Sequence, residues 1–267
     1  VLMKAATGLG LGKLVLAERA GLSVEAVDAL LQGNLDEGAL RAVSRVLHLD
    51  AEALLAMPTD REQPQPLKME GMVCLNSPFP VPGYPEMTVN SYLFWSLDTG
   101  EAVVFDTGTN IDALLQNVES RNLNVQRLFL THAHRDHVAA YDSIRESFPG
   151  LVCYAPDGEP YEKALPVSHG DIFSFGCLQV EARSTPGHSP GGTSYVLHGL
   201  ARPVGIVGDA LFCRSQGGVA QAHYTSALEV NRRQILSLSE ETILCPGHGP
   251  MTTVGWELSG NPFYAGK

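Results

Sequence analysis

The stretch THAHRDH, residues 131–137, decides how the rest of this sequence is interpreted. It follows an apolar, β-prone run over 127–130 and precedes a run over 138–148 with helical spacing. It therefore connects a strand to a helix, and a tight connection can turn several side chains toward one point. Imidazole nitrogens and carboxylate oxygens are ligands of zinc and other borderline divalent ions. We predict a metal site whose ligands include His132, His134, Asp136 and His137.

An ordinary structural role is the alternative for each of these side chains taken singly. A lone histidine is usually a surface residue or a core residue with satisfied hydrogen bonds. Three histidines and one aspartate within residues 132–137 would instead crowd strongly hydrated groups together, and a metal ion removes that cost by coordinating them. The clustering therefore favours the metal site.

Three further candidate ligands lie in turns farther along the chain. His188 lies in TPGHSPGG, Asp209 follows the apolar run 204–207, and His248 lies in CPGHGP after a short β-prone run. Each could be an ordinary turn residue. Because binding groups converge at strand ends in layered α/β folds, we expect these three, together with the first motif, to supply the further ligands that a two-metal site needs.

The chain divides by pattern into two regions. Residues 1–57 carry helical spacing, with Ser23, Asp36 and Asp50 as predicted N-caps. Residues 58–68 are polar and proline-rich, as in an inter-domain linker. In residues 69–267, β-prone runs alternate with helical patterns, which predicts an α/β fold of sheets covered by helices. The predicted strands cover 89–97, 102–105, 127–130, 151–155, 178–183, 193–197, 204–207 and 242–244, and the predicted helices cover 111–121, 138–148 and 226–238.

Composition limits the classes of partner. Asp and Glu outnumber Lys and Arg by 29 to 18, which argues against a general nucleic-acid binder or an anionic-membrane binder. The five cysteines form no C-x-x-C pair, so a disulfide framework is not expected. No apolar run is long enough to span a bilayer, and we interpret the glycine-broken start as folded chain. We expect a cytoplasmic protein.

The order H-x-H-x-D-H, P-G-H, G-D and P-G-H-G resembles the metallo-β-lactamase superfamily over about residues 70–267. The resemblance implies a four-layer αββα sandwich that binds two divalent metal ions, zinc first, with iron and manganese as alternatives. In VVFDTGT, Asp106 matches an aspartate that orients a ligand from outside the metal shell. The implied ligands are His132, His134 and His188 for one ion, Asp136, His137 and His248 for the other, and Asp209 bridging both.

Within this superfamily, residues 246–263 and GDALF at 208–212 resemble the short bacterial hydroxyacylglutathione hydrolases, the glyoxalase II-like group. The resemblance implies a small thioester substrate, with S-acyl-glutathione the leading class and a related ester or lactone open. The segment 213–223 departs from the long enzymes of this kind. Asp136 and Asp209 are the expected catalytic residues, acting on a hydroxide that bridges the metals and attacks the substrate carbonyl. His223 is the best substrate-contact candidate outside the ligands.

The segment LAERAGLSVEAV, residues 16–27, resembles the helix-turn-helix of the Cro/C1-type (XRE) family. A DNA-reading helix needs basic and amide side chains, whereas 24–31 offers Glu25 and Asp28. We therefore expect a packing or self-association module, through which the chain could form a homo-oligomer. Two alternatives stay open: a mononuclear iron persulfide dioxygenase, and a DNA-binding regulator whose lactamase-like domain senses a ligand.

Overall fold

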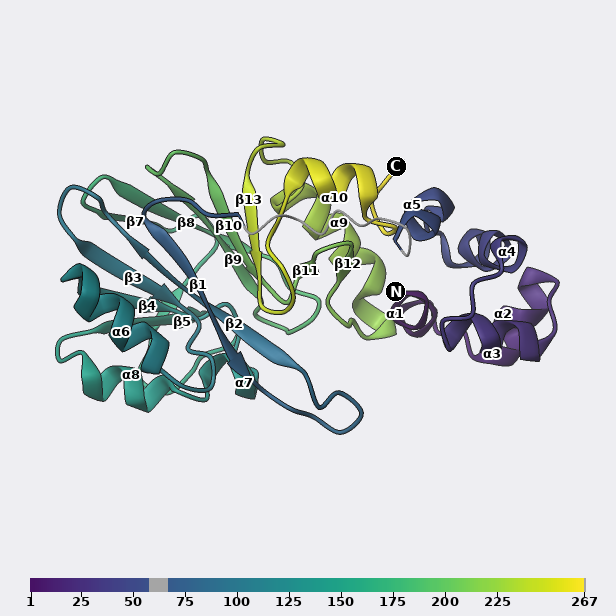
Figure 1. Ribbon diagram of the computed structural model, residues 1–267, viewed down its shortest axis with the longest axis horizontal. Coiled ribbons are helices and arrows are strands. Elements are labelled where there is room, and N and C mark those ends of the chain that lie inside the picture. The colour runs from purple at the N-terminus through teal and green to yellow at the C-terminus, as the bar shows by residue number, and fades with distance from the viewer. Residues whose placement is uncertain (58–66, 267) are drawn as a thin grey trace.

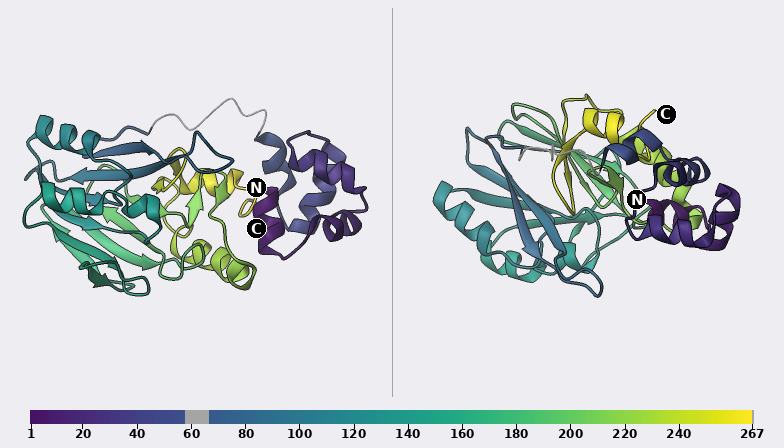
Figure 2. Two further views of the ribbon diagram at one scale, coloured as in Figure 1. Left: turned by 90° about the horizontal axis from the view of Figure 1, so that it is seen from below. Right: turned by 45° about the vertical axis from the view of Figure 1, so that its right-hand side comes forward.

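The computed structural model describes residues 1–57 and 67–266, so residues 58–66 of the predicted linker lie outside the described part. A sandwich of two sheets lies beside a group of short helices, and α1 (Leu2–Gly8) lies between the two parts (Figure 1 and Figure 2). Among the described residues, none of the helices combines the length and the apolar character needed to cross a bilayer.

The first sheet has the strand order β1-β2-β3-β4-β5-β6. Its first three strands pair antiparallel, and β3 to β6 pair in parallel. The parallel strands β3 and β4 are apolar and almost fully buried at their carboxyl ends, where the first ligand motif begins. The strands are β1 (Met72–Pro78), β2 (Thr88–Trp95), β3 (Glu101–Phe105), β4 (Asn124–Phe129), β5 (Val152–Pro156) and β6 (Leu165–Val167).

The second sheet has the strand order β14-β13-β10-β9-β8-β7. β10 and β13 run in parallel and are buried throughout, so their carboxyl ends deliver Asp209 and His248 to the same edge. The strands are β7 (Ile172–Phe175), β8 (Leu178–Ser184), β9 (Thr193–His198), β10 (Val204–Gly208), β13 (Ile243–Pro246) and β14 (Thr252–Thr253).

Three apolar cores hold four layers together. The core between the sheets joins Phe105 and Phe129 of the first sheet to Tyr195 of the second. On the outer face of the first sheet, α6 (Asp112–Arg121) and α8 (Tyr141–Ser147) bury Leu114 and Ile144. On the outer face of the second sheet lie α9 (Tyr224–Gln234) and α10 (Val254–Gly260). The predicted αββα sandwich is confirmed.

The predicted elements need two corrections. The helix predicted over 138–148 is two helices, α7 (Arg135–Val138) and α8, because the chain turns at Ala139–Ala140. Asp136 and His137 therefore lie on a single helical turn and not on an open loop. In addition, β1, β6, β7, β14, α10 and the short pair β11 (Leu211–Phe212) and β12 (Ser215–Gln216) were not predicted. These elements are short or half-exposed, so they carry little apolar periodicity.

The helices of residues 1–57 are α1, α2 (Lys13–Ala20), α3 (Val24–Leu31), α4 (Glu37–Leu47) and α5 (Ala51–Ala56). The three predicted N-caps are confirmed: the side chains of Ser23, Asp36 and Asp50 accept the backbone N–H groups of Ala26, Ala39 and Ala53. Each bond satisfies a helix-terminal donor that has no partner within its helix.

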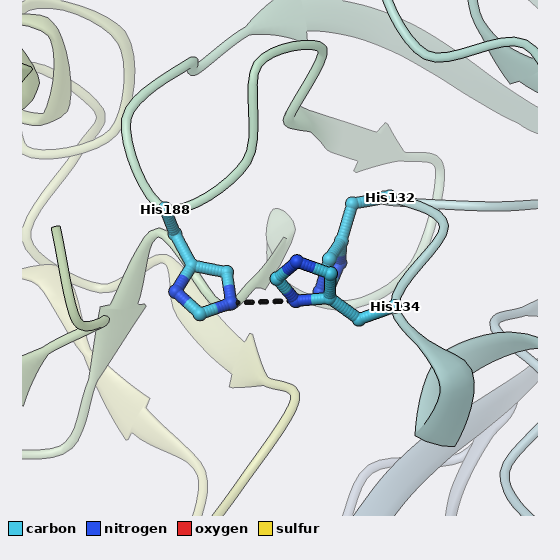
Figure 3. Close-up of side chains that lie close together, drawn as sticks. All are labelled: His132, His134 and His188. Carbon is cyan, nitrogen blue, oxygen red and sulfur yellow. Dashed lines mark hydrogen bonds between the residues drawn. The ribbon is translucent and has the colours of Figure 1, made fainter. Parts of the chain in front are cut away.

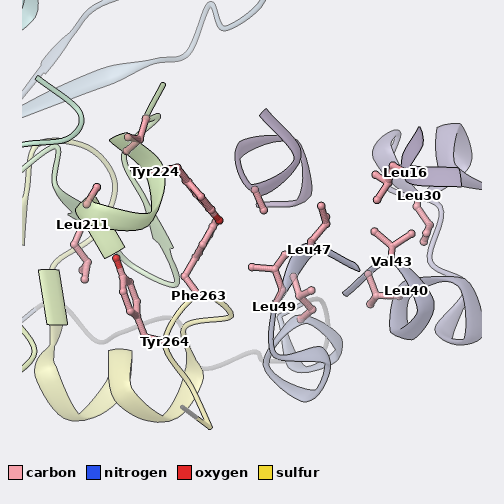
Figure 4. Close-up of a cluster of buried hydrophobic side chains, with 14 of the residues drawn as sticks. Leu16, Leu30, Leu40, Val43, Leu47, Leu49, Leu211, Tyr224, Phe263 and Tyr264 are labelled. Carbon is pink, nitrogen blue, oxygen red and sulfur yellow. The ribbon is translucent and has the colours of Figure 1, made fainter. Parts of the chain in front are cut away.

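These helices share one apolar core with the second sheet's outer layer. Figure 4 shows Leu47 and Leu49 on one side of this core and Phe263 and Tyr224 on the other, with Tyr264 beyond. The backbone N–H of Asp50 donates to the carbonyl of Pro262 at 2.8 Å. Gly8 packs so closely on the ring of Tyr224 that a Cβ there would collide with it. The N-terminal helices are thus packed onto the sandwich through α1 and α5, and the division into two domains stays a prediction.

Candidate metal centre

All seven predicted ligands come together at one edge of the sandwich. They arrive from four places: the connection after β4, the helix α7, the loop between β8 and β9, and the ends of β10 and β13. Three groups of side chains each bring their donor atoms within 4.8 Å of one another. These groups are His132, His134 and His188; His132, His137 and Asp209; and Asp136, His137 and His248.

The first group consists of three histidines. Figure 3 shows His188 facing His134, with Nε2 of the former 2.9 Å from Nδ1 of the latter. The ring of His132 lies 4.6 Å from that of His134, centroid to centroid. His188 Nδ1 donates to the carbonyl of Gly218 at 2.9 Å, so its Nε2 keeps a lone pair for the centre of the group.

The group of Asp136, His137 and His248 contains one carboxylate and two histidines. His248 Nε2 lies 3.1 Å from an oxygen of Asp136, and His137 Nε2 lies 3.7 Å from the same oxygen. His248 Nδ1 donates to the carbonyl of Thr88 at 2.6 Å, which again leaves Nε2 as the inward nitrogen. Asn90 and Tyr92 of β2 donate to the carbonyl of Pro246 and hold the turn that carries His248.

Asp209 belongs to the remaining group and lies between the other two, the group of three histidines and the group of Asp136, His137 and His248. Its Oδ1 is 3.3 Å from His137 Nε2, and its Oδ2 is 3.3 Å from His188 Nε2 and 3.5 Å from His248 Nε2. One carboxylate therefore faces histidines of both groups, through different oxygens toward His137 and His188. This is the position that the resemblance implied for a bridging ligand.

The donor set fits a divalent cation. Three buried atoms that point into the cluster have no hydrogen-bond partner among residues 1–57 and 67–266, namely His132 Nε2, His137 Nε2 and Asp209 Oδ1. A buried polar atom without a partner is costly, and coordination of a cation would satisfy all three at once. Nitrogen and carboxylate donors in this number suit zinc, iron or manganese.

Burial and neighbouring charges shift the pKa values of the clustered side chains in different directions. Burial lowers the pKa of His132 and His188. Burial alone would also lower the pKa of His248, but its bonds to Asp136 and Asp209 raise that pKa to about 10. Burial opposes ionisation of Asp209, yet contact with His137 and His248 holds its pKa well below the usual range. Without metal, protons on some histidines balance the carboxylates, and a cation would replace those protons.

Asp106 binds Nδ1 of His137, while Nε2 of the same ring faces the cluster. Its Oδ2 accepts from His137 Nδ1 at 2.8 Å and from the Thr131 hydroxyl at 2.8 Å, and its Oδ1 accepts from the Thr131 backbone N–H at 2.7 Å. Asp106 adopts a left-handed backbone conformation with φ 55°, which is strained for a residue other than glycine. The carboxylate thus orients one ligand and anchors the connection that carries two others.

Replacing Asp106 with alanine should weaken metal affinity by roughly 10–100-fold, because the His137 ring loses the partner that fixes its orientation. Competition with a chromophoric chelator measures this affinity. Asp112→Ala, at the exposed start of α6, is the matched control. Equal affinities in the two variants would contradict the orienting role of Asp106.

One residue that supports the metal centre, Glu159, was not predicted from the sequence. Glu159 accepts the backbone N–H of Ala133 at 2.9 Å and of Gly191 at 3.2 Å, so it ties the loop of the first two ligands to the loop of His188. No motif distinguishes this glutamate in the sequence. His223, predicted as a substrate contact, lies exposed at the end of η1 (Gln221–His223), and within the described part of the chain its side chain makes no hydrogen bond to the cluster.

Fold and site together define a metal-dependent enzyme built on an αββα sandwich. A family model described as the metallo-beta-lactamase superfamily matches residues 84–248, and this chain belongs to that superfamily. The matched range lies entirely outside residues 1–57.

Known relatives narrow the class. The chain is 28% identical over 210 residues to the hydroxyacylglutathione hydrolase GloC of Haemophilus influenzae, covering 67% of this chain and 93% of the relative. It superposes on the ETHE1 crystal structure from Myxococcus xanthus with a TM-score of 0.61 and 27% identity, covering 72% and 85% of the two chains. It also superposes on TTHA1623 in a di-iron-bound form, with a TM-score of 0.53 and 27% identity over 70% and 99%. The chain is accordingly a metallo-hydrolase of this superfamily.

Proposed function

We propose that this protein is a binuclear metallohydrolase that cleaves the thioester bond of a small substrate, with S-acyl-glutathione the leading class. The position of Asp209 carries the proposal, since its carboxylate faces histidines of both ligand groups at 3.3 Å. The hydroxyacylglutathione hydrolase activity named for the Haemophilus relative supports the substrate class, and the di-iron form of TTHA1623 supports two metals. A related ester or lactone would undergo the same chemistry.

Each residue has a defined task in this proposal. His132, His134 and His188 would hold one ion, Asp136, His137 and His248 would hold the other, and Asp209 would be a ligand shared by the two sets. Divalent ions held there would lower the pKa of water and polarise a substrate carbonyl. Asp136 would orient the attacking water by accepting its hydrogen bond. Gly218 and Thr88 keep the Nε2 atoms of His188 and His248 directed inward.

Elemental analysis tests the proposal on protein purified without added metal or chelator. We expect about two equivalents of zinc, iron or manganese per chain. We also expect hydrolysis of an S-acyl-glutathione, measured by the appearance of free thiol. A single iron per chain without thioester turnover would contradict the proposal and match the mononuclear persulfide dioxygenase instead. Absence of metal after reconstitution would leave a scaffold or regulator.

We further propose that residues 1–57 form a packing domain and do not read DNA. The helix α3, which corresponds to the recognition helix in the helix-turn-helix resemblance, carries Glu25 and Asp28, and Asp28 pairs with Lys13 of α2. Carboxylates on this surface repel phosphate groups. In gel-shift assays with genomic fragments at low salt, the full chain should leave DNA mobility unchanged. If the chain retards particular fragments, and unlabelled DNA of the same sequence abolishes the retardation, the result would support the DNA-binding regulator instead.

A further inference from the structure

A cavity of about 610 Å³ lies where the N-terminal helices meet the sandwich. Pockets for small organic ligands fall in the range of about 300–1,000 Å³. The lining is largely apolar and comes from both parts of the chain. It includes Leu2 and Met3 of α1, Leu31 of α3, Met57 after α5, Tyr84 of the hairpin between β1 and β2, and Val219.

One segment joins this cavity to the metal centre. Gly217 packs against the backbone carbonyl of Asp209. A Cβ on residue 217 would collide with that carbonyl and would lie 3.2 Å from the Cβ of His188. Gly218 binds His188 Nδ1 through its carbonyl and also lines the cavity. Val219 continues along the cavity wall. The backbone that positions two ligands is therefore also part of the cavity.

Lys4 is the one charged side chain in the lining among the described residues. Its ammonium donates to the carbonyl of Gln216 at 2.6 Å and to the Ser215 hydroxyl at 3.4 Å, and it lies 4.5 Å from the centre of the Phe212 ring. That ring lies 5.7 Å from the ring of His248. Lys4 therefore belongs to the end of the cavity that adjoins the metal centre.

No carboxylate within the described ranges forms an ion pair with Lys4, although the side chain is half-buried. Burial lowers the pKa of Lys4, and the charge of Asp209 opposes that shift. A half-buried ammonium bound only to neutral oxygens and an aromatic face has capacity for an anionic oxygen. The cavity is thus apolar over most of its surface and cationic at the end near the metals.

We infer that the N-terminal helices complete the substrate site: the cavity binds the apolar acyl group of the thioester, and Lys4 binds the oxygen end of that group beside the metal centre. The inference rests on the proposed function and names its substrate class. Water adds to the thioester carbonyl, the carbon–sulfur bond breaks, and the products are a carboxylate and a thiol. The carboxylate product then carries the anionic oxygens that Lys4 binds.

A series of acyl thioesters of N-acetylcysteamine, from acetyl to decanoyl, tests the inference with the metal-loaded full chain. This carrier is small and uncharged, so the acyl group is the only variable. We expect kcat/KM to rise with chain length by up to about fourfold per methylene until the cavity is filled. A kcat/KM that does not change with chain length would overturn the inference while leaving the proposed hydrolysis intact.

Two variants locate the effect in the cavity. Met3 lines the cavity and is 63% exposed, so Met3→Glu should fold normally while placing a carboxylate against the acyl chain. The ratio of decanoyl to acetyl kcat/KM should fall by at least about tenfold. Leu14→Glu, on α2 and 72% exposed outside the lining, is the matched control and should keep the wild-type ratio. Equal ratios in both variants would contradict the assignment.

Direct binding separates this inference from the proposed function. Calorimetry should show decanoate binding to the full chain more tightly than acetate, whether or not any thioester is hydrolysed. Lys4→Met should weaken the binding of decanoate by at least about tenfold but leave the affinity for decanol unchanged, because only decanoate presents anionic oxygens. If decanoate does not bind and the chain is a dimer that Met3→Glu dissociates, a second copy fills the cavity and the inference is wrong.

Discussion

Asp209→Ala is expected to lower kcat/KM for thioester hydrolysis on the order of 1,000-fold or more. Two losses combine in this variant. The side chain that faces both ligand groups is removed, so metal affinity falls, and His137 and His188 lose the carboxylate that lies 3.3 Å from each of them. Metal-activated water is the source of most of the rate enhancement in such sites, so disrupting both metal positions removes it. Steady-state kinetics and metal analysis of the same preparation measure both losses.

Folding of this variant has to be checked separately, since Asp209 is buried. Circular dichroism should show the wild-type content of helix and strand, because the strands around β10 remain packed without the carboxylate. Asp98→Ala, in the exposed turn between β2 and β3, is the matched aspartate control and should keep full activity. Full activity and full metal content in Asp209→Ala would refute its bridging role.

Removing the metals should lower the melting temperature. The difference in melting temperature between the metal-loaded and the metal-free protein should grow as the pH rises. A ligand present at 100 times its Kd stabilises the native state by about 2.7 kcal/mol, which for a protein of this size corresponds to roughly 5–10 °C. In the metal-free protein, the proton on His248 supplies part of the missing stabilisation, because its pKa is raised to about 10.

The sign follows from linkage. A group whose pKa is raised in the folded state stabilises it fully below its ordinary pKa, near 6.5, and this contribution is lost as pH rises through the folded value. The lowered pKa of Asp209 acts only at acid pH, so it does not offset this loss. Between about pH 6.5 and pH 10 the metal-free protein should therefore lose stability relative to the metal-loaded protein.

Differential scanning calorimetry across this pH range, with and without chelator, measures the effect. Metal-free His248→Gln lacks the titrating ring, so its melting temperature should depend less steeply on pH than that of the metal-free wild type. A deficit that is constant from pH 6.5 to pH 10 would be inconsistent with proton–metal exchange at this histidine.

The grouping of the candidate ligands in the fold was predictable because their signal is local. His132, His134 and Asp136 lie within five positions of one another, and His188 and His248 each lie in a glycine-containing turn after a strand. The alternation of β-prone and helical runs predicted an α/β fold of sheets covered by helices, whereas the four-layer αββα arrangement was implied by the family resemblance. Their assembly into two groups around Asp209 followed only from the family resemblance, since spacing alone does not fix which strand ends are neighbours.

The supporting residues were not predictable for a physical reason. Glu159 binds Ala133 and Gly191, which lie 26 and 32 positions away, so its role depends on the finished fold. Lys4 is farther still from its partner Gln216, at a separation of 212 positions. Nothing in the sequence around either residue marks it, because these interactions are made by single side chains reaching across the tertiary structure.

The placement of the ligands on both sheets has a consequence for how the chain matures. The first ligand is His132 and the last is His248, so closing the centre requires contacts between residues far apart in the sequence. Contacts of high sequence separation form late in folding, because the entropy of the intervening loops must be overcome first. A growing chain on the ribosome therefore lacks His248 until β13 and the turn after it have been synthesised, so we expect tight metal loading to report completed folding rather than to trigger it.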